Sequence, residues 1–378
     1  MSLHHESSNS AWADCYRGQV GRHRTEVTTP ALLLDLDAAR VNSAEMAAQF
    51  RNLPANLRPH IKVHKSLQLA QMEIAAGAIG VACATVWEAE VMAQGVDDVL
   101  IANEVVSAEK VTALAELARQ HRITVAVDDL ENVAQLQKAA DLAGSDLEVL
   151  VEVDVGMGRC GVRTKDAALR LAERIEDCSR LRLRGLQGYE GHAMVPDYEA
   201  RLRAVRAANA DLIATADYLD AHGHPCEVLS GGGTGSYLIT GANPRINEVQ
   251  AGSYLLMDCF HDSLVPGDFQ FALTILATVI SLQRDSLVLD AGRKSVGVEF
   301  VMPRLARAEG QVRYFSEEHC AVDFAGSAPL SLGDTVEILP GYAPTTVNLH
   351  DVFHVIEDDV VTDIWRIHPR GSGAVCHT

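Results

Sequence analysis

One lysine stands out among the residues that can do chemistry. The segment RPHIKVHKS (58–66) places Lys62 at the carboxyl end of the second predicted strand, LRPHIKV (57–63). A lysine that points from such a strand into the interior loses solvation, and nearby cations lower its pKa further, which leaves a nucleophilic amine. A surface strand end with scattered basic residues fits the same segment, and the spacing alone does not separate the two interpretations.

A glycine-rich stretch, SGGGTGSY (230–237), is suited to binding an anion. Its backbone N–H groups can close on a phosphate, and the hydroxyls of Thr234 and Ser236 add two donors on either side of Gly235. The stretch matches neither the GxxxxGK(S/T) pattern of nucleoside-triphosphate loops nor a convincing GxGxxG dinucleotide pattern. We predict a phosphate-binding loop here, and a tight turn without a ligand is the alternative.

Two further predicted strand ends carry groups that suit the same anion. In QAGSY (250–254) the Gly-Ser pair can complete a phosphate cup, and VDVGMGRCGV (153–162) presents Arg159. An arginine stays charged and offers several donors to an anionic oxygen, although a surface loop arginine is the alternative. A lysine, a phosphate cup and an arginine at one face describe a site for pyridoxal phosphate, held as a Schiff base on the lysine.

The elements that must position these groups follow a regular pattern. From about residue 29 to 260, short apolar runs alternate with longer amphipathic stretches. The predicted strands cover 31–37, 57–63, 79–85, 98–103, 123–129, 147–154, 183–189, 226–232 and 247–254. About eight βα units in one run favour a (β/α)8 TIM-type barrel over an open doubly wound sheet, with the site at the carboxyl ends of the strands.

The pattern changes after Pro266. β-Branched runs broken by Gly, Pro and Asp turns predict an antiparallel β domain there. We therefore expect an α/β chain in three parts: an N-terminal arm (1–28), a pyridoxal-phosphate-binding barrel (29–265) and a C-terminal antiparallel β domain (266–378).

Composition narrows the possible partners. The formal net charge of −19 argues against binding nucleic acid or an anionic membrane surface. There is no apolar run of about 18 residues to form a transmembrane helix, and the polar start lacks the apolar core of a secretory signal. Eight cysteines without a CxxC pair indicate reduced thiols. We predict a cytoplasmic protein with a small-molecule substrate.

The motifs together resemble those of a known family. PHIKVHK, NEVV, EVDVGMGRCGV, SGGGTGSY, QAGSYLLMD and TVNLHD follow one another from about residue 29 to 371. Their order and spacing are similar to the D-threonine aldolase and D-serine dehydratase family, a branch of the alanine-racemase-like (fold-type III) pyridoxal-phosphate enzymes. The resemblance implies a barrel with a β domain, a homodimer, and pyridoxal 5'-phosphate as cofactor.

The resemblance also implies roles for individual residues. Lys62 matches the Schiff-base lysine, Arg159 the arginine that binds the cofactor's phenolic oxygen, and Gln250 the position facing the pyridine nitrogen. Tyr189 is placed to flank the cofactor. The implied cofactor-binding set is Lys62, Arg159, Tyr189, Thr234, Gly235, Ser236, Gln250, Gly252, Ser253 and Tyr254. The implied catalytic set is Lys62, His192 and Tyr189.

One segment departs from the family pattern. The family carries His-x-Asp or His-x-Cys before the TVNLHD-like segment as ligands of a divalent metal, whereas this chain has Tyr342 and Pro344 there. Proline offers no side-chain ligand, so a divalent metal is doubtful at this place and its ligands are unknown. The alternative is a set of nearby residues, His319, His350, Asp351 and His354.

These features predict a lyase that cleaves a β-hydroxy-D-amino acid by a retro-aldol reaction. Without a metal, a general base must take the β-hydroxyl proton. His192 is the best placed candidate, and His319, Tyr342, His64 and Lys65 are the others. The alternatives are an amino-acid racemase, a D-serine-type dehydratase, and a non-catalytic pyridoxal-phosphate-binding protein. The extra β domain argues against the last of these.

Overall fold

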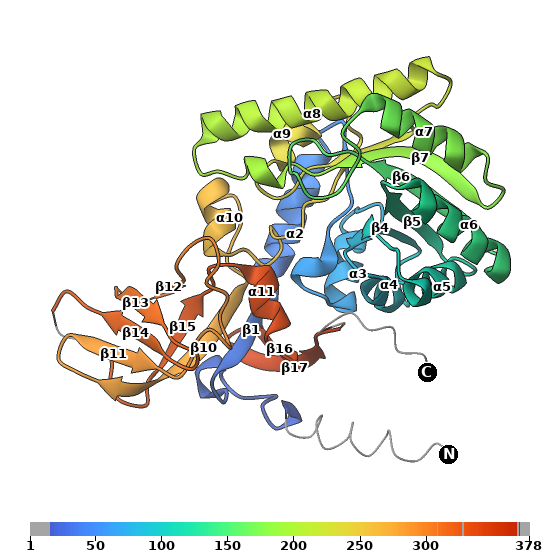
Figure 1. Cartoon of the computed structure of the whole chain (residues 1–378). Helices are drawn as coiled ribbons and strands as arrows, with labels where there is room; N and C mark the ends of the chain where they lie inside the picture. The colour runs from blue at the N-terminus through green and yellow to red at the C-terminus, as the bar shows by residue number, and fades with distance from the viewer. Residues whose placement is uncertain (1–15, 308, 327–328, 369, 371–378) are drawn as a thin grey trace, which may run out of the picture. The chain divides into compact units, whose positions relative to one another are not determined.

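The chain of 378 residues forms two compact units (Figure 1). A computed structural model describes residues 16–307, 309–326, 329–368 and 370. One unit contains the described residues up to Asn42 together with Leu255–Ile367, and the other contains Ser43–Tyr254 and the described residues from His368 on. No helix in the described part of the chain is long and apolar enough to cross a membrane.

The Ser43–Tyr254 unit contains eight strands, all parallel, in the order β2-β9-β8-β7-β6-β5-β4-β3. A parallel bridge between His60 and Ala82 joins the two end strands and closes the ring. The strands are β2 (Asn56–Leu57), β3 (Val81–Cys83), β4 (Asp98–Glu104), β5 (Arg122–Val127), β6 (Leu147–Glu152), β7 (Leu181–Gly188), β8 (Val228–Gly231) and β9 (Glu248–Val249). The predicted (β/α)8 fold is confirmed.

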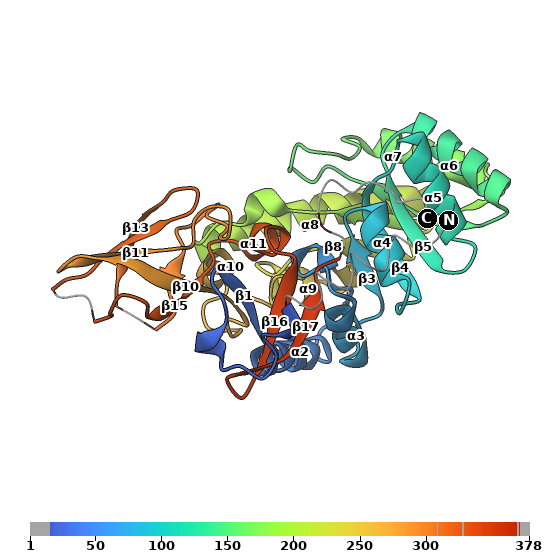
Figure 2. The same cartoon turned by 90° about the horizontal axis from the view of Figure 1, so that it is seen from below.

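Helices follow the strands and surround them (Figures 1 and 2). Helix α7 shows why they form: Ala168, Leu171, Ala172 and Ile175 recur at helical spacing and are all buried, and the Thr164 hydroxyl caps the first turn. The helices are α2 (Leu36–Phe50), α3 (Leu67–Ala75), α4 (Val86–Met92), α5 (Ala108–Leu117), α6 (Leu130–Ala143), α7 (Lys165–Glu176), α8 (Tyr198–Ala221) and α9 (Tyr237–Gly241). The amphipathic stretches of the sequence thus form the outer layer of the barrel.

The predicted first barrel strand belongs to the other unit. Strand β1 (Ala31–Asp35) pairs antiparallel with β10 (Leu273–Leu282) and parallel with β16 (Val352–Glu357). Its run of leucines is fully buried, as in a barrel strand. An apolar run of this kind fits any sheet buried on both faces, and pairing with a distant strand leaves no local signal. The predicted barrel span of 29–265 differs from the unit boundaries for this reason.

The unit with the C-terminal segments contains a nine-stranded sheet, in the order β13-β14-β11-β10-β1-β16-β17, with β15 pairing β10 and β12. Its pairs are antiparallel, as predicted, except for the parallel β1–β16 pair, which lies beside β17 in Figure 2. The other elements are β11 (Ser286–Leu289), β12 (Arg304–Leu305), β13 (Gln311–Phe315), β14 (Cys320–Asp323), β15 (Thr335–Leu339), β17 (Val360–Arg366), α10 (Cys259–Leu264) and α11 (Ala343–Asn348).

Part of the predicted N-terminal arm (1–28) is integrated into this unit. Residues 1–15 lie outside the described part. Arg24, in the short 3-10 turn η1 (Arg24–Glu26), is 5% exposed and pairs with Glu337 at 2.9 Å and with Asp359 at 3.2 Å. A buried arginine needs such partners, so this part of the segment is held in place.

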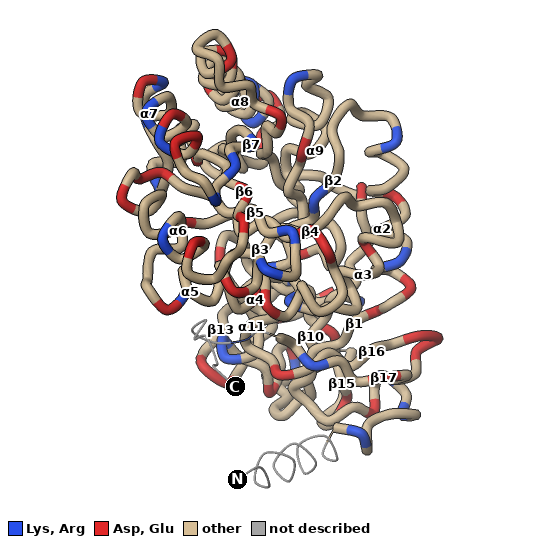
Figure 3. The backbone as a smooth tube through the Cα atoms, turned by 90° about the vertical axis from the view of Figure 1, so that its right-hand side faces the viewer, with Lys and Arg blue, Asp and Glu red and all other residues tan. Residues whose placement is uncertain are grey.

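Charged residues of both signs lie on the helices and loops around the barrel (Figure 3). Many form exposed pairs, such as Arg119 with Glu116 at 3.1 Å, which contribute little to stability. The barrel unit is held together mainly by a buried apolar cluster contributed by its strands and helices.

Candidate active site

Lys62 lies at the carboxyl end of the barrel, but not in a strand. Strand β2 ends at Leu57, and Lys62 is the middle residue of the 3-10 turn η2 (Ile61–Val63). The N–H groups of His64 and Lys65 both donate to the Ile61 carbonyl, at 3.0 and 2.8 Å, which closes the turn. The prediction of a strand over 57–63 was wrong in this detail because these local bonds replace ladder pairing after His60.

The surroundings of Lys62 make its amine reactive. Burial and then the charge of Arg159 lower the pKa of Lys62 to about 8, against the opposing effect of Glu88. The Lys62 Nζ lies 5.7 Å from the centre of the Tyr189 ring, and the Arg159 Cζ lies 5.8 Å from the same centre. The structure therefore brings together the lysine, the arginine and the tyrosine that the sequence predicted.

The two glycine loops are adjacent. The Tyr254 N–H donates to the Thr234 hydroxyl at 3.1 Å, which joins the loop after β8 to the loop after β9. A Cβ on Gly252 would collide with the carbonyl oxygen of His60, so only glycine allows this loop to approach the lysine segment. Gly235 and Ser253 lie in these same loops, so every predicted phosphate-binding position lies in one of two neighbouring segments.

Glu190 organises the first glycine loop, and the sequence did not reveal this role. Its side chain is 1% exposed and accepts hydrogen bonds from the Ser236 hydroxyl at 2.7 Å, the Thr240 hydroxyl at 2.9 Å and the Gly232 N–H at 3.1 Å. The Ser236 hydroxyl also accepts from the Gly233 N–H at 3.0 Å. The hydroxyl of Ser236 therefore shapes the loop from inside. The sequence marked Glu190 only as a lone acid two residues after the end of β7.

Gln250 belongs to a buried polar chain. Its Nε2 donates to the Ser230 hydroxyl at 2.8 Å and to Gln187 Oε1 at 3.2 Å, and Ser230 in turn donates to Glu248 at 2.7 Å. The amide is neutral and its orientation is fixed by these acceptors. It offers any group beside it a dipole rather than a charge.

Tyr254 contributes its backbone to the site while its side chain is engaged elsewhere. The phenol is 1% exposed and donates to Glu73 at 2.7 Å. His64 is fully buried against the same carboxylate, with Nε2 at 3.2 Å, while Lys65 pairs with Glu88 at 3.4 Å. His64 and Lys65 therefore hold the lysine segment in place, and neither is the base that the sequence left open.

His192 lies in the turn η3 (Gly191–Ala193) just beyond β7 and is exposed. A Cβ on Gly156 would lie 2.9 Å from its Nε2. The histidine therefore contacts the glycine-rich segment that carries Arg159. By contrast, burial together with Lys62 and Arg159 holds the pKa of His60 well below its usual range, so His60 stays neutral.

The segment that replaces the family's metal ligands has a structural role. Tyr342 precedes helix α11, and the Ala343 N–H donates to Asp258 at 2.8 Å. Burial raises the pKa of Tyr342 to about 12, so the phenol keeps its proton. His350 donates to the Ser295 carbonyl at 2.8 Å.

The alternative ligand set does not assemble. His354 bonds the Leu32 carbonyl at 3.1 Å from within a strand. Within the described residues, the grouping with metal-ligand spacing consists of Glu104, Asp128 and Cys160. The set His319, His350, Asp351 and His354 does not come together in this way.

Comparison with known proteins places this architecture in a class. Residues 34–259 match the family described as "Alanine racemase, N-terminal domain", and residues 272–356 match "Putative serine dehydratase domain". This combination defines an alanine-racemase-like barrel followed by a β domain.

Individual relatives narrow the class. The chain is 38% identical to a D-threonine aldolase of Arthrobacter sp and 36% identical to a 3-hydroxy-D-aspartate aldolase of Paracoccus denitrificans (strain Pd 1222). Both matches cover 93% of this chain and 95% of the relative. The crystal structure of D-threonine aldolase from Filomicrobium marinum superposes with a TM-score of 0.89 at 37% identity, over 93% of this chain and 98% of that one.

The chain belongs to the alanine-racemase-like family, in the branch that contains these aldolases. The resemblance inferred from the motifs is confirmed, as is the prediction of a fold-type III lyase. The family implies pyridoxal phosphate as the cofactor.

Proposed function

We propose that this protein cleaves β-hydroxy-D-amino acids by a pyridoxal-phosphate-dependent retro-aldol reaction. The observation that carries the proposal is Lys62, a lysine of lowered pKa beside Arg159 and Tyr189 at the carboxyl end of a barrel. The aldolase relatives, which match over almost the whole chain, support the reaction type.

The residues of the site fit the cofactor. Lys62 would supply the amine for the covalent link, Arg159 a cation for the phenolic oxygen, and Gln250 a neutral amide beside the pyridine nitrogen, with both of its N–H groups already bonded to Ser230 and Gln187. The loop at Gly252, packed closely against the His60 carbonyl, and the neighbouring glycine loop held by Glu190 would offer backbone N–H groups to the phosphate. When bound, pyridoxal phosphate supplies an electron sink for breaking a bond at the amino carbon.

The chain's own groups divide the remaining work. Because the pKa of Lys62 is about 8, a useful fraction of the amine is unprotonated near neutral pH. Tyr189 provides the ring that flanks the cofactor. We assign His192 as the base, with a ring nitrogen taking the proton of the substrate's β-hydroxyl.

The family's metal position does not fit a divalent ion in this chain. Tyr342 keeps its proton because its pKa is raised to about 12, and Pro344 has no donor atom in its side chain. The proposed reaction therefore uses a side-chain base rather than a metal at this place.

A substrate panel tests the reaction. Purified protein with pyridoxal phosphate is incubated with matched D- and L-forms of threonine, phenylserine and 3-hydroxyaspartate, and aldehyde, keto acid and enantiomer composition are measured. Glycine together with an aldehyde from the D-forms alone is the expected result. Keto acid would identify a dehydratase, enantiomer exchange a racemase, and no turnover a cofactor-binding protein.

Two further assignments complete the proposal. A homodimer is expected from the family resemblance, and light scattering on the purified protein tests it. A cytoplasmic location is consistent with the cysteines of the described residues, which are free thiols.

A further inference from the structure

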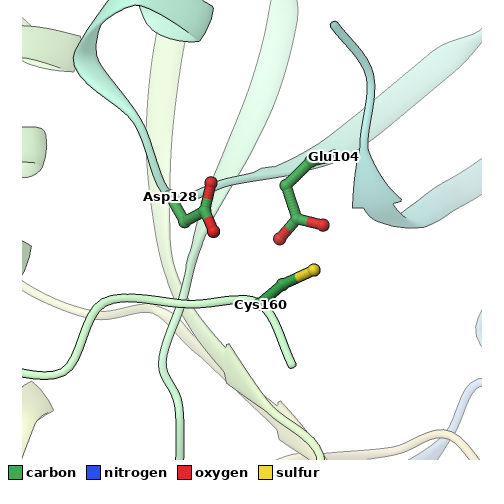
Figure 4. Close-up of side chains that lie close together, drawn as sticks. All are labelled: Glu104, Asp128 and Cys160. Carbon is green, nitrogen blue, oxygen red and sulfur yellow. The ribbon is translucent and has the colours of Figure 1, made fainter. Parts of the chain in front are cut away.

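A second cluster of reactive side chains lies at the carboxyl end of the barrel. Glu104 ends β4, Asp128 follows β5 directly, and Cys160 lies in the segment after β6. Their ligand atoms all lie within 4.8 Å of one another. Figure 4 shows the two carboxylates and the thiol converging from three separate segments of the chain.

The register of the strands explains why the carboxyl groups meet. Leu100 and Leu150 pack together inside the ring, so the alternate residues of β6 also face inward. Beyond an irregularity in β4, Glu104 pairs in register with Ala126. Ala126 of β5 pairs in register with Leu150. Asp128 and Glu152 come two residues further along and therefore face the interior on neighbouring strands.

Glu152 provides an independent observation. It is 5% exposed, and its Oε2 has no hydrogen-bond partner among the described residues. The Oε1 of Glu104 is likewise buried without a partner in the described part of the chain.

Such an arrangement is costly for the protein alone. A buried carboxyl oxygen without a partner loses its hydration without compensation, and the neighbouring carboxylates of Glu104 and Asp128 repel each other. Asp128 has one bond, from the Gly161 N–H at 2.9 Å to Oδ2. A bound cation would supply the missing partner to all of these groups at once.

We propose that Glu104, Asp128 and Cys160 bind a divalent cation of borderline softness, of which Zn²⁺ is the best match, with Glu152 facing it. One sulfur and two carboxylate oxygens form a set that zinc accepts, with a fourth position left for water or Glu152. Hard cations such as Mg²⁺ and Ca²⁺ prefer all-oxygen sites. This site uses none of the residues at the family's metal position.

The thiol sets how binding depends on pH. A cysteine binds such a cation as the thiolate, so the cation must displace the proton of the Cys160 thiol. Binding is therefore accompanied by proton release and tightens as the pH rises.

Cobalt titration of the full-length protein tests the site without reference to activity. Protein stripped with a chelator is titrated with Co²⁺, and thiolate coordination is followed by its sulfur-to-cobalt charge-transfer band in the near ultraviolet. We expect saturation at one equivalent and competition by Zn²⁺. Cys160→Ser should remove the band, and Asp128→Asn should weaken Co²⁺ binding by about 10- to 100-fold.

The control is Cys178→Ser, which removes a buried thiol of the same unit whose Sγ bonds the Arg174 carbonyl at 3.2 Å. This variant should keep the band. A band that persists in Cys160→Ser, or wild-type protein that takes up neither Co²⁺ nor Zn²⁺, overturns the proposal. Circular dichroism checks folding, and Glu104→Gln decides the outcome if Cys160→Ser does not fold, because its titration must also show weakened binding.

Discussion

The two ends of the barrel differ in how their charged side chains are paired. At the amino end, Arg58 pairs with Glu248 at 2.8 Å and with Asp98 at 2.7 Å, and Arg184 pairs with Glu148. Each of these arginines meets carboxylates in a buried or half-buried setting. Charge-assisted hydrogen bonds of this kind fix the positions of both side chains.

At the carboxyl end, like charges lie close together. Burial and then the charge of Arg159 lower the pKa of Lys62, and burial together with the carboxylates of Glu104 and Asp128 raises the pKa of Glu152. These groups sit in unfavourable charge states that a ligand can relieve.

The contrast separates the charged residues that stabilise the barrel from those that are suited to binding and catalysis. Pairs of opposite charge at the amino end stabilise the folded barrel. Groups with shifted pKa values at the carboxyl end are typical of sites that bind a cofactor, a substrate or a cation. Substitutions at the two ends should therefore have different consequences.

The largest expected effect is loss of the cofactor link in Lys62→Met. Wild-type protein with pyridoxal phosphate should show an absorption band that borohydride reduction fixes on the peptide containing Lys62. The variant should lack this adduct and lose activity by several orders of magnitude, because Lys62 is the lysine that lies beside Tyr189 and Arg159. Peptide mapping after reduction makes the measurement.

Lys65→Met is the matched control, since Lys65 is three residues away and pairs with Glu88 at 3.4 Å. It should retain the adduct. A reduced adduct on Lys65 or Lys294 in the wild-type protein would show that the lysine was misassigned.

The next effect concerns stability at the amino end. Arg58→Met leaves Glu248, which is 3% exposed, without its cation, and should lower the free energy of unfolding by about 3–5 kcal/mol. Urea denaturation measures it. The exposed pair Arg119–Glu116 supplies the control, because Arg119→Met should cost less than about 1 kcal/mol. If both variants lost the same free energy of unfolding, the buried pairs at the amino end would have no special role in stability.

Much of the barrel could be predicted from the sequence because its signals are local. Each βα unit carries an apolar run and an amphipathic helix, so the alternation predicts eight parallel strands with chemistry at their carboxyl ends. The glycine loops could be predicted because runs of glycine are also a local signal. The structure gives the physical need at Gly252, where the backbone closely approaches His60.

The remainder depends on contacts that are distant in the sequence. Strand β1 pairs with β10 and β16, which are distant in the sequence, and no local pattern predicts this pairing. Glu190 is a single acid whose role appears only when the glycine loop folds onto it. The proposed cation site combines side chains from three segments, Glu104, Asp128 and Cys160. Their proximity could not be predicted without knowing the register of the strands.

A smaller effect follows from the unfavourable state of Lys62. Its pKa is about 8 when folded and 10.5 ordinarily, so between these values the unfolded chain binds more protons and stability rises with pH. Below pH 8 the protonated, buried amine carries its full penalty. Cofactor-free Lys62→Met should therefore be more stable than wild type at pH 7 by about 1–3 kcal/mol. The gap should close towards pH 10.5, as measured by urea denaturation at several pH values; a gap independent of pH would contradict the assignment.

Glu190→Gln should weaken the phosphate loop. The carboxylate accepts three hydrogen bonds, and an amide would present a donor to at least one of these donors. We expect the affinity for pyridoxal phosphate to fall by about tenfold, corresponding to one lost bond of about 1.4 kcal/mol. Fluorescence titration measures it, with exposed Glu199→Gln as the control. Unchanged affinity would mean that the loop is held by its glycines alone.

The smallest expected effect on activity is that of metal removal. Tyr342 and Pro344 leave the family's position without two ligands, and the proposed base, His192, needs no cation. A cation at Glu104, Asp128 and Cys160 relieves charge at the carboxyl end but takes no part in the proposed proton transfer. Exhaustive chelation should therefore leave turnover nearly unchanged, while elemental analysis shows that any bound zinc is lost in Cys160→Ser. If chelation abolishes activity and the metal content is unchanged in Cys160→Ser, a different set of residues binds a catalytic metal, and the assignment of His192 as the sole activator of the β-hydroxyl fails.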